Sequence, residues 1–455
     1  MNHTFDAIIL GMGPGGEVAA SQLIGAGLKV AVVERELIGG ECGYWACIPS
    51  KTLLRPAEAR SEADRAAGVD GATLDWRDAS DYRDTMIRHL DDAAQVSGYA
   101  NQGATVIKDA GRAVGPGRVV AGGRELRAKH IVVATGTVPV LPDLPGIGEI
   151  TAWTNRETYT ATTLPRRAII VGGSAVGIET ATFLARFGVD VTLVHRGGTV
   201  LGREEPRVGE LALQYLEDSG VRVVLGASPA RARRDGVDSV LELECDVEID
   251  GGTTLAADVV VFATGRKAST AGLGLDLLGA ELGPKGEVVV DSRCRAADGV
   301  WAIGDVTGKL AFTHVAKYQG RVAADNILGR DREATYAGIP RVVFGIPEIA
   351  CVGLTRREAE HNGLNVRGVE LDVAAALARP WTYEREPSAA LGLLADVDRK
   401  VLVGAWAVGP QAGEWIHYAA LAVRAELPIE LLRDQVAQFP TFHEAYLAAL
   451  NEFGF

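Results

Sequence analysis

One pattern occurs twice in the chain: an apolar strand run, a glycine-rich turn and then a helical stretch. The first copy begins at residue 5, with Gly11, Gly13 and Gly16 in its turn, and the second begins at residue 168. In such a turn the first glycine permits the bend, the second lets the backbone approach a pyrophosphate, and the third allows close helix packing. Unpaired N–H groups at the helix N-terminus face the anion. The repeat therefore predicts two dinucleotide-binding folds.

The first copy carries the acidic residue that this pattern requires. Its second strand, Val30 to Val33, ends in Glu34, close to the spacing of roughly twenty residues that the fingerprint expects. A carboxylate at this point can accept hydrogen bonds from a ribose. We therefore predict that Glu34 contacts the ribose of a bound dinucleotide.

The second copy ends differently, because its second strand, Val191 to Val194, leads into His195 and Arg196, with Arg203 beyond a glycine pair. An acid would repel a 2′-phosphate, whereas arginine can bind it bidentately. The charges favour NADPH over NADH, although NAD stays possible and a solvated basic turn is the alternative. The turn itself contains Gly172, Ser174 and Gly177.

Two cysteines, Cys42 and Cys47, follow the first fingerprint. Residues five apart in a regular helix have Cα atoms about 8.5 Å apart, too far for a disulfide. A bond between them needs a distorted helix, and Gly43 and Pro49 supply the irregularity. The alternative is a pair of buried, inert thiols. We expect the remaining cysteines to be ordinary core or surface thiols: Cys245, Cys294 and Cys351.

Length and charge limit the classes of protein that the chain can belong to. A chain of 455 residues is too long for one ordinary core and predicts several domains. Its formal charge of −13 argues against nucleic-acid or anionic-membrane partners, which need clustered Lys and Arg. The apolar run at residues 7–10 is too short for a signal sequence or a membrane span. We expect a cytoplasmic protein without a metal site.

Three further segments complete the sequence pattern. Two Ala-Thr-Gly turns, which include Thr135 and Gly265, each close an apolar run and mark crossings between domains. Asp305 follows another buried-strand run, where a carboxylate faces the ligand crevice of an α/β sheet unless it is only a turn residue. From about Val342 the pattern changes to alternating strands, with helices from Glu414 onward. This region predicts a third domain without a nucleotide fingerprint.

The chain resembles the pyridine nucleotide-disulfide oxidoreductases: dihydrolipoamide dehydrogenase, glutathione reductase, mercuric reductase and soluble transhydrogenase. The resemblance rests on the two fingerprints, the cysteine segment ending at Lys51, the segment ending at Asp305, and residues 344–354. It implies an α/β fold with two Rossmann-like domains and an α+β dimerisation domain, in a homodimer. The implied boundaries are 1–150 and 268–338 for FAD, 151–267 for NAD(P), and 339–455 for dimerisation.

The resemblance also implies roles for individual residues. Cys47 would be the thiolate beside the flavin and Cys42 the interchange thiol that meets the substrate. Lys51 and Glu179 would form an ion pair close to the flavin, where the lysine stabilises developing negative charge. FAD would be held by Gly11, Gly13, Gly16, Glu34 and Asp305, and the nicotinamide nucleotide by residues 172–177. Further cofactor-binding candidates are Lys51, Thr135, Gly136, His195, Arg196, Gly265 and Arg266.

One position departs from the family pattern. Phe439 stands where the family has a histidine that serves as base for thiol exchange, and phenylalanine can neither take nor give a proton. His443, about one helical turn further on, is a candidate substitute. Glu444 occupies the position of the family's catalytic glutamate, and the resemblance implies that role, but it also matches a capping box with Thr441 as N-cap. Phe439, His443, Tyr44 and Trp45 are candidates for a substrate pocket.

Three functions remain open on these residues. The first is an NADPH- and FAD-dependent reductase that passes electrons through Cys42 and Cys47 to an activated disulfide, whose leaving thiol needs little proton help. The second reduces a quinone or another apolar acceptor stacked near Phe439. The third is a non-enzymatic flavoprotein that senses redox state. Mercuric reductase is disfavoured because residues 450–455 hold no cysteine pair, and soluble transhydrogenase because it usually lacks the full dithiol.

Overall fold

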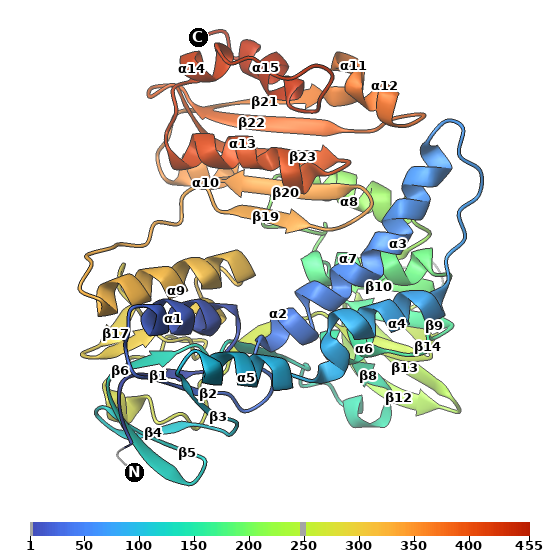
Figure 1. Ribbon diagram of the computed structural model, residues 1–455. Helices are drawn as coiled ribbons and strands as arrows, with labels where there is room; N and C mark the ends of the chain where they lie inside the picture. Colours follow the sequence, from blue (N-terminus) through green and yellow to red (C-terminus); the bar gives the residue numbers. More distant parts are fainter. Residues whose placement is uncertain (1–2, 246–251) are drawn as a thin grey trace. The chain divides into compact units, whose positions relative to one another are not determined.

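The computed structural model describes residues 3–245 and 252–455 and divides into two compact units, which are treated separately below. Unit 1 comprises Met1–Pro49, Asp81–Leu141 and Thr264–Thr335. Unit 2 comprises Ser50–Ser80, Pro142–Ala263 and Tyr336–Phe455. Figure 1 shows the elements of both units on the ribbon. The four-part domain boundaries expected from the sequence stay a prediction.

Unit 1 is built on an eight-stranded sheet whose main path runs β17-β18-β6-β1-β2-β3. The pairs β1–β2, β1–β6, β2–β3 and β18–β6 are parallel, as a dinucleotide-binding fold requires. The path strands are β1 (Thr4–Leu10), β2 (Val30–Val33), β3 (Thr105–Ile107), β6 (Arg124–Val133), β17 (Arg295–Ala297) and β18 (Val300–Ala302). An antiparallel hairpin, β4 (Arg112–Gly115) and β5 (Arg118–Ala121), continues from β6.

Two helices of unit 1, α1 (Pro14–Gly25) and α9 (Thr313–Ile327), lie side by side beside this sheet (Figure 1). They approach closely at two glycines, because a side chain at Gly320 would lie 2.6 Å from the carbonyl oxygen of Gly15. Their apolar faces form a buried core with β1 and β2 that includes Leu23 and Val322. Other elements of this unit are α2 (Gly40–Tyr44), α5 (Ala93–Asn101), β7 (Thr137–Pro139) and β16 (Arg266–Ala268).

Unit 2 contains the second nucleotide fold, a parallel sheet in the order β11-β10-β9-β15-β8. Its strands are β8 (Ala152–Trp153), β9 (Arg167–Val171), β10 (Asp190–His195), β11 (Arg222–Leu225) and β15 (Val259–Phe262). Its helices are α6 (Asn155–Thr160), α7 (Ala175–Arg186) and α8 (Pro206–Asp218). A separate antiparallel sheet is formed by β12 (Ala227–Asp235), β13 (Asp238–Cys245) and β14 (Thr254–Ala257).

The C-terminal part of unit 2 is an antiparallel sheet in the order β19-β20-β23-β22-β21. Its central strand is buried along its whole length, since helices and neighbouring segments cover both faces. The strands are β19 (Pro340–Val343), β20 (Glu348–Gly353), β21 (Val366–Asp372), β22 (Ala390–Asp396) and β23 (Val401–Gly409). The helices are α10 (Arg356–His361), α11 (Val373–Ala376), α12 (Arg379–Tyr383), α13 (Ala412–Arg424), α14 (Ile429–Arg433) and α15 (Glu444–Asn451).

Two longer helices run through a unit boundary, namely α3 (Cys47–Arg65) and α4 (Trp76–Met86). The mixed parallel and antiparallel sheets confirm the predicted α/β fold class with two Rossmann-type sheets and an α+β C-terminal part. In the described part of the chain, no helix combines the length and the apolar character needed to span a membrane.

Candidate active site

In the glycine turn after β1, two glycines are required by the fold and a third leaves space for a ligand. Gly11 has a φ of +95°, and a side chain at Gly16 would lie 2.1 Å from the carbonyl oxygen of Gly11. Both glycines are therefore needed by the protein itself. A side chain at Gly13 would meet no protein atom within 4 Å. The open space above Gly13 fits the pyrophosphate of a dinucleotide at the start of α1.

Glu34 lies at the end of β2, where the sequence predicts it, and it is buried. Its carboxylate accepts hydrogen bonds of 2.7 Å from the backbone N–H groups of Met12 and Glu36. The side chain therefore fixes the glycine turn against the second strand. Its contact with a ribose stays a prediction.

Thr135 and Asp305 follow the carboxyl ends of β6 and β18, and Arg266 contacts this region through Thr137. The hydroxyl of Thr135 is buried without a hydrogen-bond partner among the described residues. Burial raises the pKa of Asp305, and Thr137 donates a 3.2 Å hydrogen bond to its carboxylate. Arg266 donates to the Thr137 hydroxyl at 2.7 Å and pairs with Glu41 at 3.2 Å. An orphaned hydroxyl and a buried acid beside an open glycine turn fit the polar groups of FAD.

The helix that carries the two cysteines breaks between them, as the sequence predicts. Helix α2 ends at Tyr44 and α3 begins at Cys47, while Trp45 has φ −132° and ψ 0°. Cys42 and Cys47 are both half-buried free thiols, and the Cys42 thiol hydrogen-bonds to Cys47. The break thus brings together two sulfurs that a regular helix would hold apart.

The surroundings of Cys42 raise its affinity for a proton. The hydrogen bond with Cys47 and then burial raise the pKa of Cys42, against the opposing effects of Thr313 and the positive charge of Lys317. The Thr313 hydroxyl also lies 3.3 Å from Cys47 Sγ. Cys42 therefore keeps its proton and donates it to Cys47 as a hydrogen bond. Sequence reasoning missed Thr313 and Lys317, because they lie on α9, far along the chain and outside any motif.

Lys51 and Glu179, which the resemblance pairs, are in contact within unit 2. Lys51 Nζ lies 2.6 Å from Glu179 Oε2, and the lysine side chain is 34% exposed against 6% for the glutamate. The other carboxylate oxygen accepts a 3.0 Å hydrogen bond from the Phe344 N–H, and Lys51 Nζ lies 4.6 Å from the centroid of that ring. Phe344 thus positions both partners, a role that its motif alone did not indicate.

The second glycine turn repeats the geometry of the first. Gly172 has a φ of +124°, and a side chain at Gly177 would lie 1.8 Å from the Gly172 carbonyl oxygen. Ser174 is the N-cap of α7 but its side chain makes no capping hydrogen bond. The N–H groups at the start of α7 are therefore not capped by the Ser174 side chain. Gly265, in the turn after β15, has a φ of +128° and open space around it.

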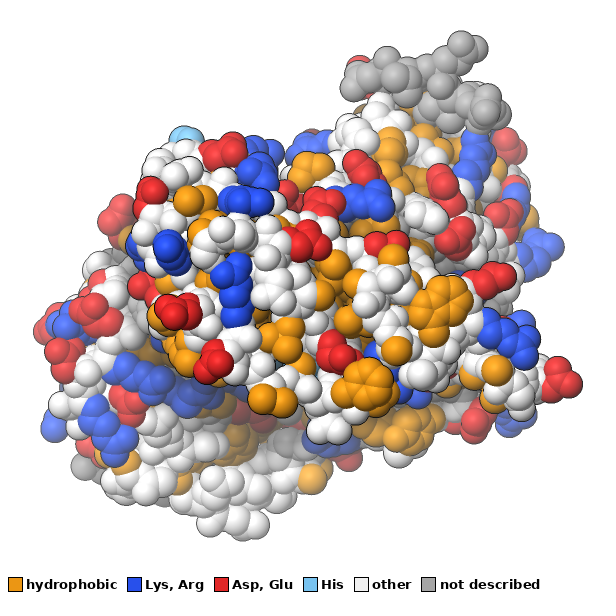
Figure 2. Space-filling view, turned by 90° about the horizontal axis from the view of Figure 1, so that it is seen from above, with side chains coloured by type: hydrophobic (Ala, Val, Ile, Leu, Met, Phe, Trp, Pro, Cys, Tyr) orange, Lys and Arg blue, Asp and Glu red, His pale blue; other side chains and the backbone are white. Residues whose placement is uncertain are grey.

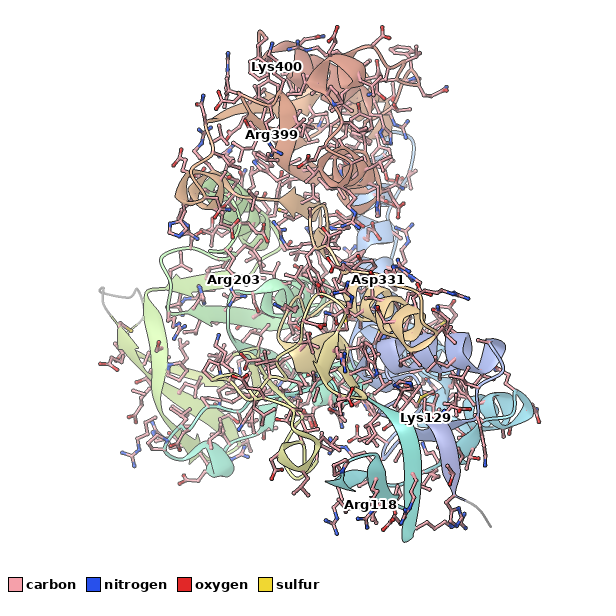
Figure 3. All side chains as sticks on the ribbon, turned by 90° about the vertical axis from the view of Figure 1, so that its left-hand side faces the viewer. Arg118, Lys129, Arg203, Asp331, Arg399 and Lys400 are labelled. Atoms are coloured by element: carbon pink, nitrogen blue, oxygen red, sulfur yellow. The ribbon has the colours of Figure 1, made fainter. Side chains whose placement is uncertain are left out.

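His195 and Arg196 follow β10 at this second turn. His195 Nδ1 accepts a 3.2 Å hydrogen bond from the Gly173 N–H. Burial, followed by the charge of Arg196, lowers the pKa of His195, so the imidazole is neutral at pH 7. Arg196 and Arg203 are exposed, and Figure 3 labels Arg203 on the green segment that joins β10 to α8. Neither arginine forms an ion pair with a described carboxylate.

The C-terminal segment corrects one prediction. Glu444 accepts a 3.1 Å hydrogen bond from the Thr441 N–H, which is one half of a capping box. The prediction that Thr441 is the N-cap is wrong, because α15 begins at Glu444 with His443 as N-cap. The Thr441 hydroxyl donates a hydrogen bond to the Gln438 carbonyl instead of capping the helix. His443 is exposed, with its ring centroid 6.4 Å from that of Tyr418.

Tyr44 also departs from its predicted place. It is fully buried and its hydroxyl donates a 3.2 Å hydrogen bond to the Ile38 carbonyl, so it belongs to the core rather than to a substrate pocket. Trp45 beside it is half-buried. Phe439 is 69% exposed and precedes a cis peptide bond to Pro440.

Several large apolar side chains of the C-terminal part are exposed, as are others elsewhere in the chain. Figure 2 shows large hydrophobic side chains exposed between acidic and basic ones in the view from above. The exposed large apolar residues of this part are Trp381, Leu421, Leu431, Val436 and Phe439.

Two Rossmann-type sheets, a glycine turn shaped for FAD and a cysteine pair across a helix break define a flavin-dependent dithiol oxidoreductase. The pyridine nucleotide-disulphide oxidoreductase family model matches residues 5–320, and the dimerisation domain model of the same family matches residues 339–450. The chain belongs to this family of FAD-dependent enzymes.

Its relatives include both dehydrogenases and reductases. The chain is 30% identical to a dihydrolipoyl dehydrogenase of Chlamydia muridarum, over 98% of this chain and 96% of that protein. It is 32% identical to a mercuric reductase of Streptomyces lividans, over 99% and 97% of the two chains. Among solved structures, the HOCl-induced flavoprotein disulfide reductase RclA from Escherichia coli matches with a TM-score of 0.87 at 27% identity, covering 99% and 100%. LpdA from Mycobacterium tuberculosis matches with a TM-score of 0.88 at 27% identity, covering 98% and 99%.

Proposed function

We propose that the enzyme oxidises NADPH and passes the electron pair through FAD to Cys42 and Cys47, which then reduce an activated disulfide. In balance, NADPH, one proton and a disulfide give NADP⁺ and two thiols. The single observation that supports this function is the helix break that sets the Cys42 thiol in a hydrogen bond with Cys47. When bound, FAD supplies the two-electron relay between nucleotide and dithiol.

The residues around the two thiols then have separate tasks. Cys47, next to Thr313, accepts the hydrogen bond of Cys42 and holds negative charge. Cys42 attacks one substrate sulfur, the substrate S–S bond breaks, and the first thiol leaves. Cys47 then attacks Cys42, which forms the Cys42–Cys47 disulfide and releases the second thiol. We further propose that the Lys51–Glu179 pair stabilises negative charge during reduction.

The proposed substrate class follows from the proton that a leaving thiol needs when the substrate disulfide breaks. With phenylalanine at position 439, no histidine stands before Pro440 to protonate the leaving thiol. A leaving thiol of low pKa departs as thiolate without such help. We therefore propose disulfides with acidic thiols, such as aryl disulfides, rather than dihydrolipoamide.

The test uses Cys42→Ser and Cys47→Ser, with Cys245→Ser as a matched control. Wild-type protein and the control should reduce 5,5′-dithiobis(2-nitrobenzoate) with NADPH, whereas both active-pair variants should lose that turnover. Anaerobic titration with NADPH should give a long-wavelength charge-transfer band in the wild type and none in Cys47→Ser. Full turnover in Cys42→Ser would contradict the disulfide function.

A second function is favoured by one observation, the exposure of 69% of the Phe439 ring. An exposed aromatic ring can stack on a quinone, which accepts electrons without thiol exchange. Menadione reduction that survives Cys42→Ser and falls in Phe439→Ala would support a quinone reductase. Absence of menadione turnover in the wild type would rule this function out.

NADPH is the proposed nucleotide because the exposed Arg196 directly follows β10, where an acid would otherwise meet the ribose, and the exposed Arg203 lies in the segment that follows it. Arg196→Met should raise the KM for NADPH and leave that for NADH little changed. We also propose a homodimer formed through the C-terminal part, to be tested by analytical ultracentrifugation. A cytoplasmic location stays a prediction from composition.

A further inference from the structure

The two arginines proposed to bind the 2′-phosphate stand on one connecting segment, residues 195–205, between β10 and α8. Near its start, the Gly173 N–H donates to His195, and Gly226 donates a 3.2 Å hydrogen bond to the Gly197 carbonyl. The backbone of Leu201 binds the Gly173 carbonyl at 3.0 Å. The first part of the segment is thus tied to the nucleotide fold itself.

The part next to Arg203 has less support from the nucleotide fold. Leu201 has a φ of +51°, a strained conformation for a residue with a side chain, so this turn persists only where neighbouring contacts hold it. Arg203 itself is exposed and Gly202 before it is exposed. The Glu204 N–H donates a 2.8 Å hydrogen bond to the Leu201 carbonyl, which closes the turn around Arg203. The position of Arg203 therefore depends on Leu201 on one side and on the contacts of Glu204 on the other.

Those contacts come from the C-terminal part of unit 2. Arg341, on β19, donates two hydrogen bonds to Glu204, of 2.8 Å from Nε and 2.7 Å from Nη2. The side chains are 24% and 15% exposed, so water screens this pair less than a surface ion pair. Arg341 also donates to the Gly353 carbonyl at 3.2 Å, which fixes the guanidinium on the sheet. Glu205 accepts a hydrogen bond from the Arg356 N–H at the start of α10.

We propose that Arg341 is a positioning residue for nucleotide selectivity: through Glu204 it holds Arg203 where the 2′-phosphate of NADPH binds. This inference rests on the proposed NADPH function. It places a selectivity determinant on β19, 137 residues after Glu204 in the chain and within the segment matched by the dimerisation domain model. The planar guanidinium of Arg341 donates two hydrogen bonds to one carboxylate, and a lysine at this position would not reproduce that geometry.

The Cys351 thiol and Arg356 are among the polar groups that border the Glu204–Arg341 pair. A cavity of about 250 Å³ borders Glu204 and Arg341, and Cys351 and Trp406 line it as well. Burial raises the pKa of Cys351 well above its ordinary value, so this neighbour stays an uncharged thiol. When Arg341 is shortened, Glu204 loses its two hydrogen bonds from the guanidinium and keeps the weaker hydrogen bond with the Cys351 thiol. The turn at residues 201–204 then loses its ion pair with β19.

The experiment compares the binding of 2′,5′-ADP and 5′-AMP to the FAD-loaded enzyme by calorimetry, since the two ligands differ only in the 2′-phosphate. Arg341→Met and Glu204→Gln should each weaken 2′,5′-ADP about tenfold, within the usual range for coupling between sites, and change 5′-AMP less than twofold. The KM for NADPH should rise while kcat with NADH is kept. The charge-reversed double variant Glu204→Arg/Arg341→Glu should recover part of the loss.

A matched control is Arg399→Met, at a residue labelled in the C-terminal part in Figure 3. This substitution breaks another arginine–carboxylate pair, in which Arg399 Nε lies 2.8 Å from the Asp396 carboxylate. It should leave the binding of both ligands unchanged. Equal weakening of 2′,5′-ADP and 5′-AMP in Arg341→Met, or no change in either, would overturn the inference while leaving NADPH preference intact. A wild-type enzyme that binds the two ligands equally would overturn the NADPH proposal and this inference together.

Discussion

Glu179 binds Lys51 at 2.6 Å with one carboxylate oxygen and the Phe344 N–H at 3.0 Å with the other. Both oxygens of the buried Glu179 carboxylate thus have hydrogen-bond partners. The Phe344 N–H fixes the orientation of this carboxylate, which in turn fixes the lysine. Lys51 also stands four residues after Cys47 on α3, which places the two side chains on one helix face. The ion pair with Glu179 therefore holds the Lys51 ammonium group in one position on α3.

Replacing that cation tests its proposed role. Lys51→Met should slow the reduction of bound FAD by NADPH by roughly 100-fold, the loss typical of one electrostatic contact to a developing charge. Glu179→Gln should slow it less, because the lysine stays but is held less firmly. Anaerobic stopped-flow absorbance measures the rate, with exposed Lys285→Met as control. An unchanged rate in Lys51→Met would reduce the pair to a structural contact.

The second and third glycines of the first turn, Gly13 and Gly16, give opposite expectations. Gly16→Ala should destabilise the protein, because the new methyl would lie 2.1 Å from a backbone oxygen. Gly13→Ala should leave the unfolding temperature of the apoprotein unchanged, since no protein atom lies within 4 Å, but it should weaken FAD. Thermal unfolding and the ratio of bound flavin to protein measure the two effects. Gly25→Ala, in open space on the same helix, should change neither.

Much of this site follows from local sequence signals. The fingerprints fix a strand, a turn and a helix within a few residues, and Gly43 and Pro49 flank the point where the helix breaks. Thr313 could not be found in this way, because its position beside Cys47 is set by the packing of α9 against α1. Tyr44 was misassigned for a similar reason: an aromatic residue next to a reactive cysteine looks like a pocket wall, but the fold turns it into the core.

The pKa shift of Cys42 predicts how disulfide reduction depends on pH. Its hydrogen bond with Cys47 and its burial raise the pKa above the ordinary value, so the protonated form predominates at neutral pH. The attacking thiolate therefore becomes more abundant as pH rises and scarcer as it falls. The rate at which prereduced enzyme reduces an aryl disulfide should rise up to about tenfold per pH unit from pH 7 to pH 9. A rate that is flat over this range would show that another group already removes the proton.

The last prediction concerns the position where the chain departs from its family. Phe439→His restores a group that can exchange protons at neutral pH, on a segment whose exposed ring leaves room for the smaller imidazole. Turnover with dihydrolipoamide should rise roughly 100-fold, the lower part of the range for a positioned acid–base group, and the steep alkaline dependence should flatten. Phe439→Leu is the control, since it changes size without adding a base. NAD⁺ or NADP⁺ reduction by dihydrolipoamide measures the effect. Equal dihydrolipoamide turnover in Phe439→His and Phe439→Leu would show that the missing histidine does not determine substrate choice. The proposed selection of disulfides by the acidity of the leaving thiol would then be wrong.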